Sequence, residues 1–231
     1  MVARKLFSSK VGTARQKDPE AAGGDRPPPY EPTIPTSLEN YMANSTLKDK
    51  LPNEKKFKER AAEVRRSVKE NAIKGSCVVL TSQNAAYRGS TGIGTLTHQE
   101  ENCVWSGQWN NGVLHGFGTR HYEGSWYEGE WKNGEMSGIS RYVHKTGGAY
   151  FGEWLCNKSD GFGRWEYPDS RVHIGELEGD SKHGKGIYYD PKRGDIWDGE
   201  WRFGKFVDGG VTRLDGHKDR WRNGKQVRKT C

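Results

Sequence analysis

Residues 127–134 read Tyr-Glu-Gly-Glu-Trp-Lys-Asn-Gly, and this pattern returns with small changes along the second half of the chain. Each copy has an aromatic residue, a glycine two residues later and a second aromatic residue two residues after that. Successive copies start 22, 23, 23 and 24 residues apart, at Trp105-Ser-Gly107-Gln-Trp109, Tyr127-Glu-Gly129-Glu-Trp131, Tyr150-Phe-Gly152-Glu-Trp154, His173-Ile-Gly175-Glu-Leu177 and Trp197-Asp-Gly199-Glu-Trp201. A fixed period of this length predicts tandem structural repeats.

The two aromatic residues of each copy are expected on one face of a β-strand. Positions i, i+2 and i+4 of a strand share a face, and the glycine between the rings leaves a gap that a neighbouring ring can fill. The predicted aromatic row consists of Trp105, Trp109, Tyr127, Trp131, Tyr150, Trp154, Trp197 and Trp201. We interpret it as internal packing between repeats. The alternative is a concave surface that accepts a helix or an extended segment of a partner.

A turn is predicted three residues after each second aromatic position. This position holds only Gly, Asn or Asp, the residue types that tolerate positive φ, at Gly112, Gly134, Asn157, Asp180, Gly204 and Gly224. Each unit is therefore expected to be a β-hairpin. A single hairpin is not stable alone, so five stacked units are expected to form one long, twisted antiparallel sheet in which each unit contacts only its neighbours.

The second strand of each hairpin carries a Gly-x-Gly pair seven residues after the second aromatic position. The second unit has Ser140 in place of the last glycine. The fifth unit has Asp208 and Gly210, so its first glycine is lost. The predicted strand and turn glycines are Gly107, Gly112, Gly116, Gly118, Gly129, Gly134, Gly152, Gly161, Gly163, Gly175, Gly184, Gly186, Gly199 and Gly204.

Four segments follow from these patterns and from the rest of the chain. Residues 1–45 contain a proline cluster and are expected to be an extended or disordered arm. Residues 46–75 hold a basic amphipathic helix, roughly Asn53 to Ile73, with Phe57, Ala61, Val64 and Val68 on one face and an end at Gly75. Residues 79–224 form the repeat array, with five full hairpin units from residue 105 and partial units at each end. Residues 225–231 form a basic tail.

The charge is divided unevenly among these segments. Residues 1–78 carry 16 Lys/Arg against 10 Asp/Glu, residues 79–215 carry 15 against 19, and residues 216–231 carry 6 against 1. The folded middle is mildly acidic, which argues against a nucleic-acid groove there. The basic ends are suited to an acidic protein surface or a membrane. The basic residues of the predicted helix that are candidates for partner binding are Lys55, Lys56, Lys58, Arg65, Arg66 and Lys69.

The amphipathic helix has three interpretations: it caps this protein's own sheet, it binds a partner, or it lies on a membrane surface. Glu130, Glu153, Glu176 and Glu200 follow the strand glycine and are expected to form an acidic row on the face opposite the aromatics. That row is interpreted as a solvated sheet face, and the alternative is a docking strip for a basic partner. Catalytic carboxylates are not expected, because an acid–base pair is not built by repetition in every unit.

These residues resemble the MORN repeat family, whose unit is close to YxGxWxxGxxHGxG. The resemblance rests on the segments 127–134 and 111–118 and covers about residues 86–224. It implies an elongated β-sheet without intrinsic catalysis or cofactor. It also implies the settings in which such arrays occur, among them ciliary radial spokes and other axonemal proteins, junction proteins near membranes, and accessory segments on enzymes.

No motif in the chain predicts an enzyme, a cofactor or a metal site. The histidines His115 and His183 occupy the turn-to-strand position of the repeat, and His121, His144 and His173 show no metal-ligand spacing. The four cysteines, Cys77, Cys103, Cys156 and Cys231, form no CxxC pair and are interpreted as reduced thiols. No apolar run is long enough for a transmembrane helix.

The sequence thus predicts a non-catalytic structural or adaptor protein of a cytoskeletal assembly, with the axoneme of a cilium or flagellum as the expected setting. The expected partners are other proteins of that assembly, such as tubulin or axonemal subunits, and not nucleic acid. The alternative function is a peripheral membrane scaffold that binds anionic phospholipids through the basic flanking segments. A mitochondrial location is a further alternative, because residues 1–17 are basic and lack acidic residues.

Overall fold

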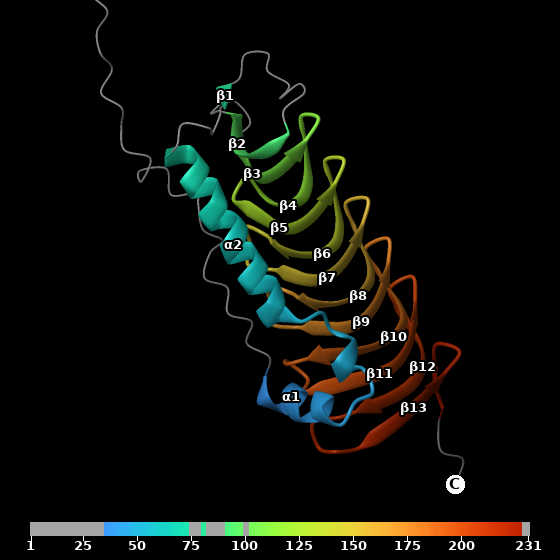
Figure 1. Cartoon of the computed structure of the whole chain (residues 1–231). Coiled ribbons are helices and arrows are strands. Elements are labelled where there is room, and N and C mark those ends of the chain that lie inside the picture. The colour runs from blue at the N-terminus through green and yellow to red at the C-terminus, as the bar shows by residue number, and fades with distance from the viewer. Residues whose placement is uncertain (1–34, 74–79, 82–90, 99–101, 228–231) are drawn as a thin grey trace, which may run out of the picture.

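The structure, a computed structural model, describes residues 35–73, 80–81, 91–98 and 102–227. Within these residues fourteen strands form one open sheet in which every strand lies beside its neighbour in sequence (Figure 1). Strands β2 to β14 pair antiparallel, and the short β1 pairs parallel with β2. This arrangement confirms the predicted fold class.

The strands differ in length, and the two ends of the sheet are formed by the shortest. Their bounds are β1 Leu80–Thr81, β2 Gly92–His98, β3 Cys103–Asn110, β4 Val113–Tyr122, β5 Ser125–Lys132, β6 Glu135–Val143, β7 Ala149–Leu155, β8 Lys158–Glu166, β9 Val172–Glu178, β10 Ser181–Asp190, β11 Asp195–Arg202, β12 Lys205–Thr212, β13 Lys218–Arg222 and β14 Lys225–Val227.

The hairpin turns have the predicted backbone conformation. The six residues predicted at positive φ have it, with values from +67° at Asn157 to +84° at Gly112 and Gly134. The residue before each of them also has positive φ, including Cys156 (+48°) and Phe203 (+47°). Two consecutive central residues with positive φ define the type I′ turn, whose twist matches that of the flanking strands.

A column of glycines runs across the sheet. Pairing from β2 to β12 places one such residue on every strand: Gly94, Gly107, Gly118, Gly129, Ser140, Gly152, Gly163, Gly175, Gly186, Gly199 and Gly209. A Cβ on Gly107 would overlap the Cα of Gly118 and the carbonyl of Phe117. The close approach of neighbouring backbones therefore explains the glycines of the column, which is interrupted only on β6, by Ser140, among the strands β2 to β12.

The fifth hairpin corrects one prediction. The sequence aligns Asp208 and Gly210 with the Gly-x-Gly pair, which puts Gly210 at the column position, but the structure pairs Gly199 with Gly209. The reason is a shorter bulge next to the turn. In the first hairpin, the partners of Gly107 and Trp109 are Gly118 and Leu114, which are four residues apart on β4. In the fifth, the partners of Gly199 and Trp201 are Gly209 and Phe206, which are three residues apart on β12. One residue fewer in the bulge moves the column position from Gly210 to Gly209.

Residues Thr36–Ala43 form helix α1, which corrects the prediction of an extended arm over residues 1–45. Leu38 and Met42 lie one helical turn apart and are buried against Ile174 and Ile187 of the sheet. That burial stabilises a short helix which the nearby prolines obscure in the sequence. The remainder of the predicted arm, residues 1–34, lies outside the described residues.

Helix α2 (Glu54–Ile73) lies across the strands on the same face as α1 (Figure 1). Asn53 caps it, because its side-chain oxygen accepts a hydrogen bond from the backbone N–H of Lys56 at 2.9 Å. Phe57 packs on Phe117 and Phe151, with ring centroids 5.5 and 5.2 Å away. Of the three interpretations of this helix, the structure therefore supports packing on the protein's own sheet.

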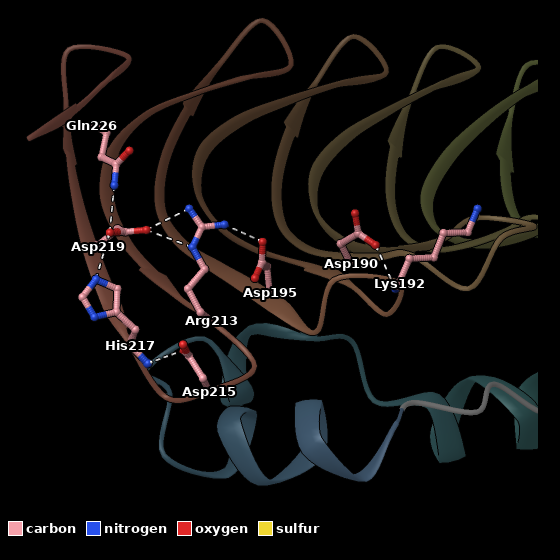
Figure 2. Close-up of polar contacts among 8 residues, drawn as sticks. All are labelled: Asp190, Lys192, Asp195, Arg213, Asp215, His217, Asp219 and Gln226. Atoms are coloured by element: carbon pink, nitrogen blue, oxygen red, sulfur yellow. Dashed lines mark hydrogen bonds and ion pairs between the residues drawn. The ribbon is translucent and has the colours of Figure 1, made fainter.

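The two faces of the sheet differ in what covers them. The strands are bowed, and Figure 2 shows α1 on their outer side while the side chains of Asp195 and Arg213 lie on the inner side. We call the helix-covered face the outer face and the opposite face the inner face. Neither α1 nor α2 has the length and apolar character needed to cross a membrane, nor has any other helix in the described ranges.

Candidate functional site

A second row of residues runs across the inner face beside the glycine column. Strand pairing aligns Leu96, Trp105, Arg120, Tyr127, Tyr142, Tyr150, Trp165, His173, Tyr188, Trp197 and Val211 on β2 to β12. Three of its rings, Tyr142, Trp165 and Tyr188, are absent from the predicted aromatic row. Each lies two residues after the column position of its strand. The sequence signal is Gly-x-Gly-x-aromatic for Trp165 and Tyr188, and Gly-x-Ser-x-aromatic for Tyr142.

The second aromatic residue of each repeat serves internal packing. Trp109, Trp131, Trp154 and Trp201 are all buried. Their indole N–H groups donate to the carbonyls of Gly94, Gly118, Ser140 and Gly186, at 2.9, 3.0, 3.2 and 3.0 Å. Every such bond links one hairpin to the strand before it. The fourth repeat has Leu177 at this position, which is buried but has no donor.

Two residues at the first aromatic position are fully buried. The ring of Tyr150 fills the space over Gly152 and Gly163, and its hydroxyl donates to the carbonyl of Glu153 at 3.0 Å. His173 takes the same place over Gly175 and Gly186. Burial, and secondarily the nearby Lys182, lowers the pKa of His173 from 6.5 to about 3. The His173 ring is therefore neutral at physiological pH.

The other rings of the inner row are only half-buried, and neither helix covers them. They are Trp105, Tyr127, Tyr142, Trp165, Tyr188 and Trp197. Tyr127 and Tyr142 contact each other with ring centroids 4.6 Å apart, and Tyr150 and Trp165 with centroids 5.3 Å apart. The row is therefore both a packing element and an exposed aromatic surface.

Cationic side chains lie between these rings. The guanidinium of Arg120 is 5.5 Å from the ring centroid of Trp105, and that of Arg213 is 5.8 Å from Trp197. The ammonium of Lys182 lies between Tyr188 and Trp201, at 4.2 and 4.3 Å from their centroids. Burial, with a smaller effect of Arg171, lowers the pKa of Lys182 to about 8. The inner face thus combines aromatic and cationic groups.

An ion-pair network closes the C-terminal end of the inner face. The guanidinium of Arg213 donates to Asp195 at 2.6 Å and to Asp219 at 2.8 and 2.9 Å, and Gln226 donates to Asp219 at 2.8 Å (Figure 2). Hydrogen bonds from Arg213 hold the pKa of Asp219 below its usual value. Nearby, Asp190 and Asp215 accept backbone N–H groups of Lys192 and His217 and stabilise the turns there.

The predicted acidic row lies on the outer face. Carboxylate oxygens of Glu130, Glu153 and Glu176 occupy the space beside Gly138, Gly161 and Gly184, where a Cβ would otherwise lie. Two row members bind basic residues of the N-terminal segment: Arg60 contacts Glu130 at 3.1 Å and Lys50 contacts Glu176 at 3.4 Å. Part of the acidic strip is thus occupied by the chain's own basic segment.

The six predicted basic residues of α2 are not brought together into one patch. Arg65 faces the sheet and forms an ion pair with the buried Glu128. Burial raises the pKa of Glu128, and the Arg65 guanidinium opposes this effect. The other five side chains, Lys55, Lys56, Lys58, Arg66 and Lys69, are exposed.

The histidines and cysteines with described side chains form no reactive group. His115 lies 3.5 Å from the backbone N–H of Asn133 and His183 lies 3.0 Å from Glu178. Across the described ranges, His, Cys, Asp and Glu side chains form no group of three or more that could hold a metal ion. Cys103 is buried and Cys156 is exposed at a hairpin turn, and neither forms a disulfide with another described residue.

An open sheet of repeating hairpins, with an inner aromatic surface and helices on the outer face, defines a tandem-repeat binding scaffold. The MORN repeat family model matches residues 105–126, 127–148, 150–170 and 173–194. Residues 105–194 therefore contain four MORN repeats, and such repeats generally mediate protein or membrane interactions without catalysis. The β11–β12 hairpin continues the same register beyond the matched residues. The comparison with curated proteins gave no match.

Proposed function

We propose that this chain is a non-catalytic docking scaffold that binds another protein along its inner face. The observation that carries the proposal is the contrast between the two faces. The outer face is covered by the chain's own helices, whereas six rings of the inner row are half-exposed. Tyrosine and tryptophan contribute strongly to protein interfaces, because one end of the ring is apolar and the other polar.

The dimensions and charges of the row indicate the kind of partner. Neighbouring strands lie about 4.8 Å apart, so the rings from Trp105 on β3 to Trp197 on β11 span roughly 40 Å. A helix of about 25 residues has that length. Arg120 and Lys182 lie among the rings. They favour a partner segment that carries aromatic or aliphatic residues together with carboxylates.

We further propose that the partner belongs to a cytoskeletal assembly, in the axoneme of a cilium or flagellum, with tubulin or an axonemal subunit as the binding protein. Two features support this setting. The sheet is an elongated unit suited to spacing other subunits, and the basic ends of the chain complement acidic surfaces. Axonemal proteins are also among those in which MORN arrays occur.

The test is retention of axonemal proteins by the full-length chain. A variant with Tyr127→Ala and Tyr142→Ala removes two contacting, half-exposed rings from the centre of the row. Phe203→Ala is the matched control, because Phe203 is 77% exposed at a hairpin turn away from the row. We expect the double variant to lose the retained proteins and the control to keep them. Equal retention by both variants would exclude the inner face as the docking surface.

A second candidate function is peripheral membrane binding through the basic outer surface of α2. Its support is that five of the six basic residues named above are exposed on the helix. Binding to phosphatidylserine vesicles would then be strong at low salt and fall steeply as salt is added. Each exposed cation is expected to contribute similarly, so Lys55→Gln with Lys58→Gln and Arg66→Gln with Lys69→Gln should weaken binding equally. Absence of vesicle binding at low salt excludes this candidate.

A further inference from the structure

A cleft of about 370 Å³ lies between the second half of α2 and strands β3, β4 and β5. Arg65, Arg66 and Lys69 line it from the helix, and Ser106, Thr119 and Trp126 line it from the sheet. Among the described residues that line the cleft, three are cationic and none is acidic. The composition of the wall therefore favours an anion.

Trp126 differs from the tryptophans of the repeat. Trp109, Trp131, Trp154 and Trp201 each donate their indole N–H to a carbonyl of the neighbouring strand. Trp126 is 4% exposed, and its Nε1 has no hydrogen-bond partner among the described residues. Buried donors in folded proteins are normally paired. A ligand that enters the cleft and accepts this hydrogen bond would satisfy the donor.

The cations of the cleft are not neutralised equally. Arg65 forms an ion pair with Glu128, which is buried behind it. The positive charge of Arg141 also stabilises the Glu128 carboxylate. Arg66 and Lys69 are exposed and contact no carboxylate of the described residues. Two cations therefore remain for a ligand at the mouth of the cleft, while Arg65 is held in place by the sheet.

The hydroxyl groups on the floor are fixed by the sheet. Ser106 and Thr95 share a hydrogen bond of 2.8 Å between their side-chain oxygens. The Thr119 hydroxyl donates to the carbonyl of Ser106 at 3.3 Å. The Thr119 proton is thus used within the sheet, whereas the Ser106 hydroxyl can donate to a ligand when Thr95 donates to it. The cleft therefore combines one hydroxyl, one unpaired indole donor and two free cations. A compact anion with several oxygens matches this arrangement, because it accepts from fixed donors and mobile cations together.

We propose that the cleft between α2 and strands β3 to β5 binds a phosphate monoester, with Arg66 and Lys69 on its charged oxygens and the Trp126 N–H as a buried donor. The phosphate belongs either to a small soluble metabolite or to a lipid headgroup, since both present the same dianionic group. This site is separate from the inner aromatic face and does not depend on protein docking there. It differs from diffuse membrane attraction because it requires two particular cations of α2.

The test titrates the full-length chain with glycerol 3-phosphate and, in a second arm, with phosphatidylcholine vesicles containing phosphatidic acid, which carries the same monoester. The variant Arg66→Gln with Lys69→Gln removes the two free cations. Lys55→Gln with Lys58→Gln is the matched control, with the same charge change on exposed residues of the same helix outside the cleft. The indole N–H resonance of Trp126, assigned by its loss in Trp126→Phe, reports on the cleft itself.

We expect glycerol 3-phosphate to shift the Trp126 resonance. We also expect the dissociation constant to rise at least about tenfold in the Arg66/Lys69 variant, since charge-assisted hydrogen bonds are lost, and to change less than about twofold in the control. Binding of phosphatidic acid vesicles alone, with the same variant pattern, assigns the phosphate to a lipid. Equal weakening in both variants, or no binding in either arm, would overturn the proposal.

Discussion

The ring of Tyr150 on β7 occupies the space that glycine leaves at position 163 on β8. A Cβ on Gly163 would overlap the hydroxyl and the ring edge of Tyr150, and the hydroxyl is fixed by its bond to the Glu153 carbonyl. Tyr150 is 1% exposed and contacts Trp154 and Trp165. One glycine therefore determines whether the central rings of the array can pack.

Replacement of Gly163 by alanine is expected to destabilise the protein. The added methyl group must displace a buried ring that has no free space, which typically costs about 1–3 kcal/mol and sometimes more. Gly210→Ala is the control, because its nearest neighbour would be 4.0 Å from the new Cβ, and surface changes of this kind cost within about 0.5 kcal/mol. Urea unfolding followed by tryptophan fluorescence measures both. An equal effect of the two changes would contradict the packing role of Tyr150.

Trp131→Phe is expected to be destabilising through the loss of one hydrogen bond. Its indole N–H donates to the Gly118 carbonyl, so the variant leaves a buried acceptor without its donor, at a cost of about 1–3 kcal/mol. Trp165→Phe removes an indole from a half-buried position and is expected to cost less. Thermal unfolding of both variants compares the two positions. A larger loss in Trp165→Phe would argue against the donor ladder as a main source of stability.

Acid is expected to destabilise the protein through His173. Its pKa is about 3 in the folded protein and 6.5 in the unfolded chain, so only the unfolded chain binds the proton between these values. The contribution of His173 to the free energy of unfolding is therefore fully present above pH 6.5 and is lost progressively as the pH drops toward 3. The slope is at most about 1.4 kcal/mol per pH unit.

The His173→Tyr variant tests this prediction. It places at position 173 the residue found at the equivalent Tyr150, and it removes the titrating ring. Urea unfolding at pH 7.5 and pH 5 should show a smaller loss of stability in the variant than in the parent chain, by about 2 kcal/mol. An unchanged difference between the two pH values would show that other groups cause the acid sensitivity.

Arg65→Met is expected to destabilise the attachment of α2. The change leaves the buried Glu128 without its main cationic partner, and breaking a buried pair in this way typically costs about 3–5 kcal/mol. Adding Glu128→Gln should recover much of the loss, because no unpaired charge then remains. A double-mutant cycle measured by urea unfolding gives the coupling. Additive losses from the two changes would show that the pair does not hold the helix.

Sequence patterns predicted much of the array because its determinants are local. The turn residues need positive φ, which only a few residue types adopt easily, and the i, i+2, i+4 spacing assigns the aromatics to one face. Trp109 and Tyr150 are where that spacing predicts them. The rings that were missed, such as Trp165, lie on the second strand of each hairpin, and their place in the row follows from strand register.

The sequence by itself determined that stacked hairpins with one aromatic face recur from residue 105 onward, because turn conformation and strand alternation depend on neighbours a few residues apart. Only the tertiary structure decided that Gly209 completes the glycine column, that Thr36–Ala43 is helical, and that α2 covers the outer face. These outcomes depend on contacts between distant residues, such as Phe57 with Phe151 and Leu38 with Ile174, whose burial no local pattern encodes.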